Sequence, residues 1–256
     1  MRTFNRIFNM VYPKRPLPPS KKAVLVIFHD YEREYGNKAH GRHADKALDI
    51  FLTEEKRHGV RATYNIVGKI CESHPNSIHR ILQEDHEIAS HTYGHIYPCE
   101  INNKKFEEDL LSFHAVYSKL TGRIVHGFRS PESRWSKGMI PILERHGYKW
   151  NAEADRRFQP YILGNGLLRI PVFFDDWSYM EGSSPEMFLR DVKSVIKRAK
   201  QRHAIGGIGF HPWIHGISES RLNMFSIILD MISSDREIQT MSFSDVYQYS
   251  KSQRAH

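Results

Sequence analysis

From residue 23 onward, apolar runs of strand type alternate with segments of helical periodicity. Seven runs have the length and composition of buried strands, bounded by polar or turn-forming residues. They are Ala23–Phe28, Ala62–Val67, Glu87–Ser90, Ile124–Phe128, Leu167–Phe174, Ile205–Phe210 and Ile238–Ser242. Such alternation is typical of a parallel sheet whose strands are connected by helices.

Amphipathic helices are predicted between these runs, and their ends carry recognisable signals. Gly59 and Gly122 stop two of them, and Ser184-Pro185-Glu186 opens a third with a cap, a first-turn proline and an acid. The apolar stripes are Leu48, Phe51 and Leu52; Phe106, Leu110, Phe113, Tyr117 and Leu120; Phe188, Val192, Val195, Ile196 and Ala199; and Leu222, Phe225, Leu229 and Ile232. About seven strand–helix pairs predict an α/β fold, a distorted TIM-like barrel of about seven parallel strands with its active site at their C-terminal ends.

Residues 1–22 stand apart as a basic, proline-rich extension of a domain that covers residues 23–250. Phe4, Ile7, Phe8 and Val11 are spaced for one face of a short helix, with basic residues around it and no acidic residue in the segment. Three interpretations remain open: a helix that associates peripherally with an anionic membrane surface, a segment packed on the barrel, and disorder.

Composition narrows the possible environments and partners. The chain has 256 residues, 40% of them hydrophobic, which suffices for one core. The net charge of +8 favours anionic partners, but no nucleic-acid-binding motif accompanies it, so no nucleic acid is expected. Two cysteines and the lack of a membrane-spanning run or secretory leader predict a cytoplasmic protein, in one interpretation at the inner membrane surface.

Polar residues suited to chemistry follow the predicted strands at the edge where a barrel places its active site. They are Asp30, Glu32, His91, Arg129, Asp175, Asp176 and His211. In His91-Thr-Tyr-Gly-His95, two histidines four apart would face the same way on a helical turn, and imidazole is a preferred ligand of zinc. One of the two carboxylates could complete the ligand set while the other acts as general base. Cys99 is a poorer ligand candidate, because Pro98 breaks the helical register.

These motifs resemble the polysaccharide deacetylases, carbohydrate esterase family 4 with its NodB-homology domain. Ala62-Thr-Tyr-Asn-Ile-Val-Gly68 and His86-Glu-Ile-Ala-Ser-His-Thr-Tyr-Gly-His95 are similar to the second strand and the metal-binding motif of that family. Further similar segments are Phe128-Arg-Ser-Pro131, Gly147-Tyr-Lys-Trp150, Leu168-Arg-Ile-Pro171, Asp175-Asp-Trp177 and Phe210-His-Pro-Trp213 with Gly216 and Arg221. The resemblance covers about residues 23–250 and is strongest to the allantoinase-like and peptidoglycan deacetylase branch.

One motif departs from the usual family pattern. Many members carry adjacent aspartates after the first strand, whereas this chain has Phe28-His-Asp-Tyr-Glu32. Two assignments are then open: Asp30 as base with Glu32 on the metal, which we prefer, or Asp30 on the metal with His29 or Glu32 nearby.

The resemblance implies a role for each residue. A divalent metal, zinc in the first instance, would be held by Glu32, His91 and His95, and Asp30 would take a proton from the attacking water. His211 would protonate the departing amine, Arg129 would orient Asp30, and Asp176 or Asp175 would orient His211. Pro131, Trp177 and Trp213 are the expected substrate-binding residues, while Trp135 and Tyr179 are weaker candidates.

Three functions remain in competition. The first is removal of an acetyl or other acyl group from the nitrogen of an amino-sugar on a glycan or lipid-linked glycan. The second is hydrolysis of a small C–N substrate such as a ureide or formamide. The third is a barrel without catalysis that binds carbohydrate.

Overall fold

The computed structural model describes residues 16–253, and in that part of the chain seven parallel strands close into a barrel. Around the barrel they follow the order β1 (Ala23–Tyr31), β2 (Thr63–Ile66), β3 (Glu87–Ser90), β4 (Gly127–Arg129), β5 (Trp150–Ala154), β7 (Leu167–Phe174) and β8 (Ile205–Phe210). Because β8 and β2 both pair with β1, the sheet closes on its first strand. The α/β barrel predicted from the sequence is confirmed.

The seventh barrel strand is not the one that the sequence pattern indicated. The run beginning at Ile238 forms β9 (Ile238–Thr240), which pairs with the start of β1 outside the closed ring. Its place in the barrel is taken by β5, where Trp150 and Ala152 face the barrel interior and the alternate residues Asn151 and Glu153 are polar and fully buried on the other face. A short strand with buried polar residues at alternate positions lacks the continuous apolar run on which the prediction depended. A short antiparallel strand, β6 (Tyr161–Leu163), adds to β7 and was also missed.

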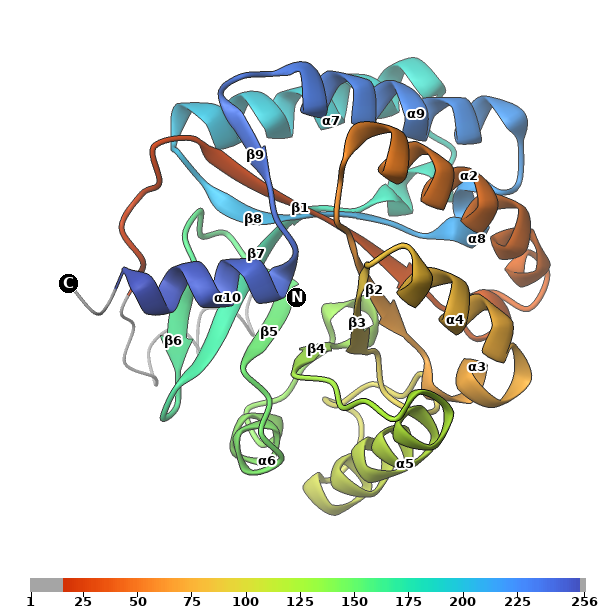
Figure 1. Ribbon diagram of the computed structural model, residues 1–256, viewed down its shortest axis with the longest axis vertical. Coiled ribbons are helices and arrows are strands. Elements are labelled where there is room, and N and C mark those ends of the chain that lie inside the picture. Colours follow the sequence, from red (N-terminus) through yellow and green to blue (C-terminus); the bar gives the residue numbers. More distant parts are fainter. Residues whose placement is uncertain (1–15, 254–256) are drawn as a thin grey trace.

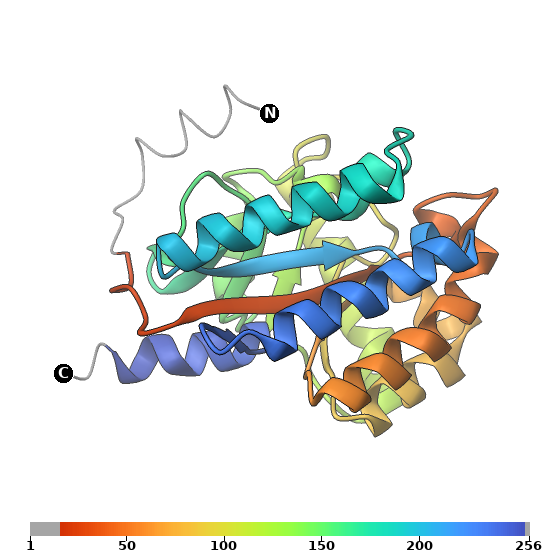
Figure 2. The same ribbon diagram turned by 90° about the horizontal axis from the view of Figure 1, so that it is seen from above.

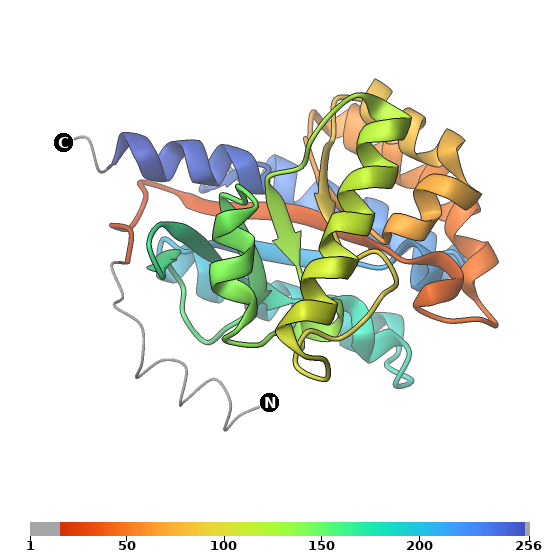
Figure 3. The ribbon, with the colours of Figure 1, turned by 90° about the horizontal axis from the view of Figure 1, so that it is seen from below.

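Helices surround the barrel (Figure 1). They are α2 (Ala44–His58), α3 (Gly68–Ser73), α4 (Pro75–Gln83), α5 (Asn103–Thr121), α6 (Met139–Arg145), α7 (Pro185–Gln201), α8 (Pro212–His215), α9 (Glu219–Ser234) and α10 (Phe243–Ser252). Figure 2 shows α7 and α9 flanking β8 and β1, and Figure 3 shows α5 and α6 on the side of β4 and β5. Short 3₁₀ turns η1 (Arg33–Tyr35), η2 (Gly41–His43), η3 (Pro131–Ser133) and η4 (Asp176–Tyr179) lie in the loops.

The predicted helix boundaries have the expected local chemistry. Gly59 and Gly122 end α2 and α5 in the left-handed region, at φ 63° and 68°. Ser184 caps α7 by accepting a hydrogen bond from the backbone N of Met187, at 3.3 Å. The stripes predicted on these helices are buried against the barrel, as Phe51, Phe113 and Phe188 show with no exposed surface.

The N-terminal end of the barrel is closed by α10. Phe243 lies 4.7 Å from Trp150 and 5.5 Å from Phe28 between ring centroids. Gly127 makes room for the indole, since a Cβ there would come within 1.9 Å of Trp150 Cζ2. With this end filled by apolar rings, the polar chemistry is left to the C-terminal ends of the strands.

Part of the N-terminal extension packs against β6. Pro16 pairs with Tyr161, and Leu17 donates its backbone N–H to the carbonyl of Pro160 at 2.8 Å and is buried. The predicted amphipathic helix over residues 4–11 lies outside the described residues. Within residues 16–253, every helix is too short or too polar to cross a bilayer.

Candidate metal centre

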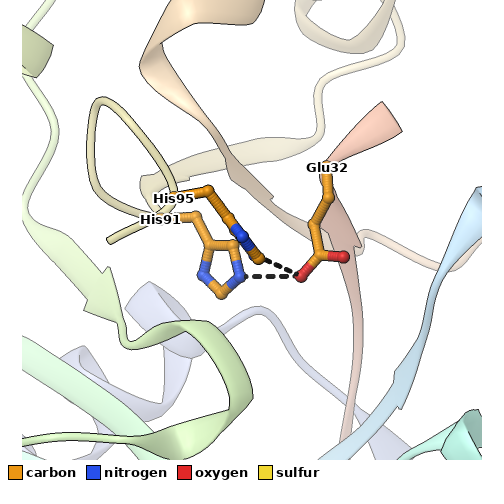
Figure 4. Close-up of side chains that lie close together, drawn as sticks. All are labelled: Glu32, His91 and His95. Atoms are coloured by element: carbon orange, nitrogen blue, oxygen red, sulfur yellow. Dashed lines mark hydrogen bonds and ion pairs between the residues drawn. The ribbon is translucent and has the colours of Figure 1, made fainter. Parts of the chain in front are cut away.

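Glu32, His91 and His95 meet at the C-terminal end of the barrel (Figure 4). Oε1 of Glu32 lies 3.2 Å from Nε2 of His91 and 3.0 Å from Nε2 of His95. Glu32 follows β1 directly, and His91 follows β3 directly. Strands β1 and β3, which lie on either side of β2 in the barrel, therefore place one carboxylate and two imidazoles at a single point.

The two histidines do not share a helical turn, which corrects the sequence prediction. Residues 91–95 form a loop in which Thr92 and His95 adopt left-handed backbone angles, at φ 65° and 58°. The carboxylate of Asp109 on α5 holds this loop by accepting hydrogen bonds from the backbone N of Tyr93 at 2.6 Å and of Gly94 at 3.0 Å. The loop directs both rings to one point at the cost of strained backbone.

Left-handed residues are concentrated around this site. Besides Thr92 and His95, the non-glycine residues with positive φ in residues 16–253 include Arg33, Glu132 and Ser133, all in loops beside the site. Strained backbone persists only where the surroundings enforce it, and it is commonly found at functional sites.

The contacts of His91 and Glu32 fix which atoms face each other. His91 Nδ1 lies 2.9 Å from the carbonyl of Arg129, so Nδ1 carries the proton and Nε2 keeps its lone pair. Trp213 donates its indole N–H to Oε2 of Glu32 at 3.1 Å, which leaves Oε1 for the histidines. Gly36 permits this packing, because a Cβ there would lie 2.0 Å from Oε2 of Glu32.

This donor set fits a divalent cation. Two neutral imidazole nitrogens and one carboxylate oxygen are the protein ligands of many catalytic zinc sites, which leave a further position for water or substrate. Glu32 and His91 are buried, so a cation here would be well shielded from solvent. The two imidazole nitrogens and the carboxylate oxygen converge on one point, as the ligand atoms of a metal site must.

Asp30 lies beside this cluster but has different partners. Its carboxylate accepts hydrogen bonds from Arg129 Nε at 2.8 and 2.9 Å and from Asn65 Nδ2 at 2.7 Å. Burial alone would raise the pKa of Asp30, but Arg129, and after it His91, outweigh burial and lower that pKa. Asp30 is therefore ionised and oriented by a buried guanidinium, which Ser133 in turn holds at 2.9 Å.

His211 completes the group from the end of β8. Its Nδ1–H donates to Asp176 at 2.6 Å, and its Nε2 lies 3.7 Å from both Asp30 Oδ2 and Glu32 Oε1. Burial opposes protonation of His211, yet Asp176 and then Glu32 raise its pKa to about 10. The sequence left the partner of His211 open between two aspartates, and the structure places Asp176 there.

Several residues weighed from the sequence lie elsewhere. His29 points away from the site and pairs with Glu55 of α2 at 2.5 Å, because successive strand residues face opposite sides. Asp175 remains at the site, where it caps η4 and lies 4.0 Å from Arg129, but Asp176 holds the place beside His211. Cys99 is an exposed free cysteine, and it does not belong to either cluster of described residues that could bind a metal.

A hollow of about 320 Å³ opens over these residues. Its lining is Asp30, Glu32, Gly36, His95, Arg129, Glu132, Asp175, Trp177 and His211. Trp177 stands at the rim with 40% of its surface exposed, above the buried Trp213 at 6.2 Å between ring centroids. Of the other predicted substrate residues, Pro131 and Trp213 are buried and do not line the hollow. Trp135 is buried against Arg169, and Tyr179 is buried behind η4.

Sequence reasoning missed Gly36, Asn65, Ser133 and Asp109. Each acts on the site through contacts between segments that are distant in the chain or in loops of irregular conformation. Only Asn65 belongs to a motif identified from the sequence. Its place beside Asp30 on the neighbouring strand could have indicated the hydrogen bond between them.

Comparisons with known proteins identify a family and a fold. The model of the polysaccharide deacetylase family matches residues 18–150. A peptidoglycan-N-acetylglucosamine deacetylase of Bacillus cereus is 30% identical over 104 residues, 41% of this chain and 35% of that protein. The chain aligns with less than half the length of this and two further curated relatives.

Solved structures share the fold over nearly the whole chain. A candidate polysaccharide deacetylase from Mycobacterium smegmatis superposes with a TM-score of 0.85 at 17% identity, covering 94% of this chain and 96% of the other. An allantoinase structure has a TM-score of 0.82 at 16% identity, with 94% and 95% covered. At such identities the likeness concerns the fold.

Proposed function

The chain belongs to the polysaccharide deacetylase family, and from this premise we propose that it is a metal-dependent hydrolase of amino-sugar amides. It would remove an N-acetyl or other N-acyl group from a polysaccharide or lipid-linked glycan. The observation that carries the proposal is the convergence of Glu32, His91 and His95 in the hollow that also holds Asp30 and His211.

Glu32, His91 and His95 would hold the cation, with zinc the first choice for two imidazoles and a carboxylate. When bound, a divalent cation supplies Lewis acidity toward water and toward the amide carbonyl. Trp213 and the carbonyl of Arg129 keep Glu32 and His91 in their present orientation, so the ligand atoms need no rearrangement.

Asp30 is placed to act as the general base. It lies against Arg129 rather than against the paired histidines, and its lowered pKa keeps it ionised and able to accept a proton from water. Arg129 and Asn65 fix the carboxylate plane, which limits where that proton can be accepted.

His211 is placed to act as the general acid. An amide nitrogen leaves poorly unless it is protonated, and the charge of Asp176 keeps a proton on His211. Nε2 of His211 lies 3.7 Å from both Asp30 and Glu32, so the general acid and the general base border the same part of the hollow.

Trp177 gives the rim an aromatic face suited to the apolar face of a sugar ring. The name of the Bacillus cereus relative, a peptidoglycan-N-acetylglucosamine deacetylase, supports an N-acetylated amino-sugar as the substrate class. A ureide or formamide substrate is the alternative to be tested beside it.

The test compares metal content and acetate release in purified wild type, His91→Ala, His95→Ala and the control His79→Ala, an exposed histidine of α4. N-acetylglucosamine oligomers, peptidoglycan fragments and allantoin are the substrates. We expect stoichiometric metal and acetate release in wild type and control, and neither in the two site variants. Activity on allantoin alone would replace the amino-sugar assignment, and sugar binding without metal would show a barrel that no longer catalyses.

A further inference from the structure

A second hollow, of about 420 Å³, lies between the loop after β5 and the C-terminal half of α7. It shares no lining residue with the hollow over the metal centre. Four of its lining residues are arginines: Arg156 and Arg157 from the loop, and Arg198 and Arg202 from the helix end. Gln159 ties the two walls together by donating its side-chain N–H to the carbonyl of His203 at 2.8 Å.

The positive charge in this hollow is not neutralised by residues 16–253. None of the four guanidinium groups has a carboxylate of a described residue within ion-pair distance, whereas Arg57, Arg80 and Arg145 do. Asp155 is the one acid among the described lining residues. Its carboxylate already accepts hydrogen bonds from the Tyr161 hydroxyl at 2.5 Å and the backbone N of Arg157 at 3.1 Å.

Aromatic rings hold two of these guanidinium groups in place. Arg157 lies over the ring of Tyr161 at 4.7 Å and Arg202 over Phe158 at 4.4 Å. Stacking on a ring face leaves the N–H groups at the guanidinium edge free to donate. Nε of Arg157 is buried without a hydrogen-bond partner in the described chain, a costly state for a charged donor unless a ligand relieves it.

A neighbouring hollow on the same helix shows the contrasting arrangement. It is lined by Lys193, Lys197 and Lys200 together with Asp235 and Glu237. Lys200 pairs with both acids at 2.6 Å, so there the chain supplies its own anions. The arginine hollow has no such internal partners among the described residues.

We infer that the arginine hollow binds a phosphate group, a function separate from the metal centre. Guanidinium groups donate pairs of parallel hydrogen bonds that match phosphate geometry, and several arginines together suit its negative charge. The bearer of the phosphate is either a soluble phosphate compound or a phospholipid headgroup. Pro16 and Leu17 join the fold beside Tyr161, and the sequence before them has four basic and no acidic residues, which favours the headgroup.

The test uses full-length protein and two charge-matched double variants. Arg198→Gln with Arg202→Gln removes two charges from the hollow at the end of α7. Lys119→Gln with Arg123→Gln removes two exposed charges from the end of α5. Calorimetric titration with inorganic pyrophosphate measures affinity, and hydrogen exchange locates protection. Cosedimentation with phosphatidylcholine vesicles, with and without phosphatidylglycerol, measures headgroup binding.

We expect pyrophosphate to protect residues 155–160 and 196–203, and affinity to fall about tenfold or more in the hollow variant only. Loss of vesicle binding in that variant alone identifies the headgroup as the source, whereas unchanged vesicle binding with lost pyrophosphate binding identifies a soluble phosphate. Equal affinity in all three proteins, or equal loss in both variants, overturns the inference. Acetate release should be the same in all three, so this result is independent of the proposed hydrolase activity.

Discussion

Asp30 and Glu32 are two residues apart, yet their surroundings prepare them for different tasks. Glu32 offers one oxygen to two imidazoles and the other to an indole N–H, which suits a metal ligand. Asp30 is bound on one side by a buried arginine and an asparagine amide, which suits a charged base held at a fixed angle. The difference arises from contacts made by β2, β4 and α8, not from the two residues themselves.

Removing each charge should therefore have a different consequence. We expect Asp30→Asn to retain metal and lose about 10²- to 10⁴-fold in kcat, the usual contribution of a general base. Glu32→Gln should lose metal as well as activity. Metal content by mass spectrometry and kcat decide the matter, with Glu34→Gln as a neighbouring control outside the hollow lining. Metal loss in Asp30→Asn with Glu32→Gln unaffected would exchange the two roles.

The pH dependence of the reaction should report on Asp176. The pKa of His211 is raised to about 10, and among the groups that raise it the negative charge of Asp176 has the largest effect. A general acid works only while protonated, so kcat/KM should fall as pH rises through the pKa of His211. In Asp176→Asn that pKa drops, and the alkaline limb should move to lower pH. A limb in the same place in both proteins would remove His211 as the acid.

At the scale of elements, the loop from His91 to His95 depends on a helix that contributes no ligand. Asp109 of α5 accepts hydrogen bonds from two backbone N–H groups of that loop, those of the residues between the left-handed Thr92 and His95. Helix α5 itself is anchored by the buried stripe of Phe106, Leu110 and Phe113. The position of His95 is thus set by packing that lies beyond the site.

Substituting Asp109 should loosen the metal more than it unfolds the protein. In Asp109→Ala the loop loses both acceptors, and we expect metal affinity to fall about 10- to 100-fold, as when other supporting contacts of a metal ligand are removed. Competition with a chelator measures the affinity. Glu108→Ala, an exposed neighbour on the same helix, is the control. Unchanged affinity in Asp109→Ala would mean that the loop holds its shape alone.

The sequence predicted whole elements better than it predicted their irregular ends. Amphipathic stripes and end signals located α2, α5, α7 and α9, and apolar runs located six of the seven barrel strands. β5 escaped because its buried residues Asn151 and Glu153 are polar, and hydrogen bonds replace apolar burial on that face. The spacing of His91 and His95 matched a helical turn, but Thr92 and His95 adopt left-handed backbone angles, and spacing alone carries no information on φ.

On the scale of the whole molecule, stability and chemistry are assigned to opposite ends of the barrel. Aromatic rings of Phe28, Trp150 and Phe243 fill the N-terminal end, whereas buried charged groups fill the C-terminal end. The motifs that could be recognised from the sequence belong to the C-terminal end. The closing helix α10 carries no such motif, and its role became evident only from its contacts.

This division predicts a variant that weakens the fold without altering the site. Phe243 has no exposed surface, so Phe243→Ala should reduce the free energy of unfolding by about 3–5 kcal/mol through lost burial and a cavity. Metal stoichiometry and kcat of the folded fraction should stay at wild-type levels. Phe243 lies at the N-terminal end of the barrel strands, whereas the metal ligands lie at their C-terminal end. Denaturant unfolding, metal analysis and kinetics on one preparation test both halves of the prediction, with Gln248→Ala on the exposed face of α10 as control. Metal loss from folded Phe243→Ala would show instead that the apolar end fixes the geometry of the ligands.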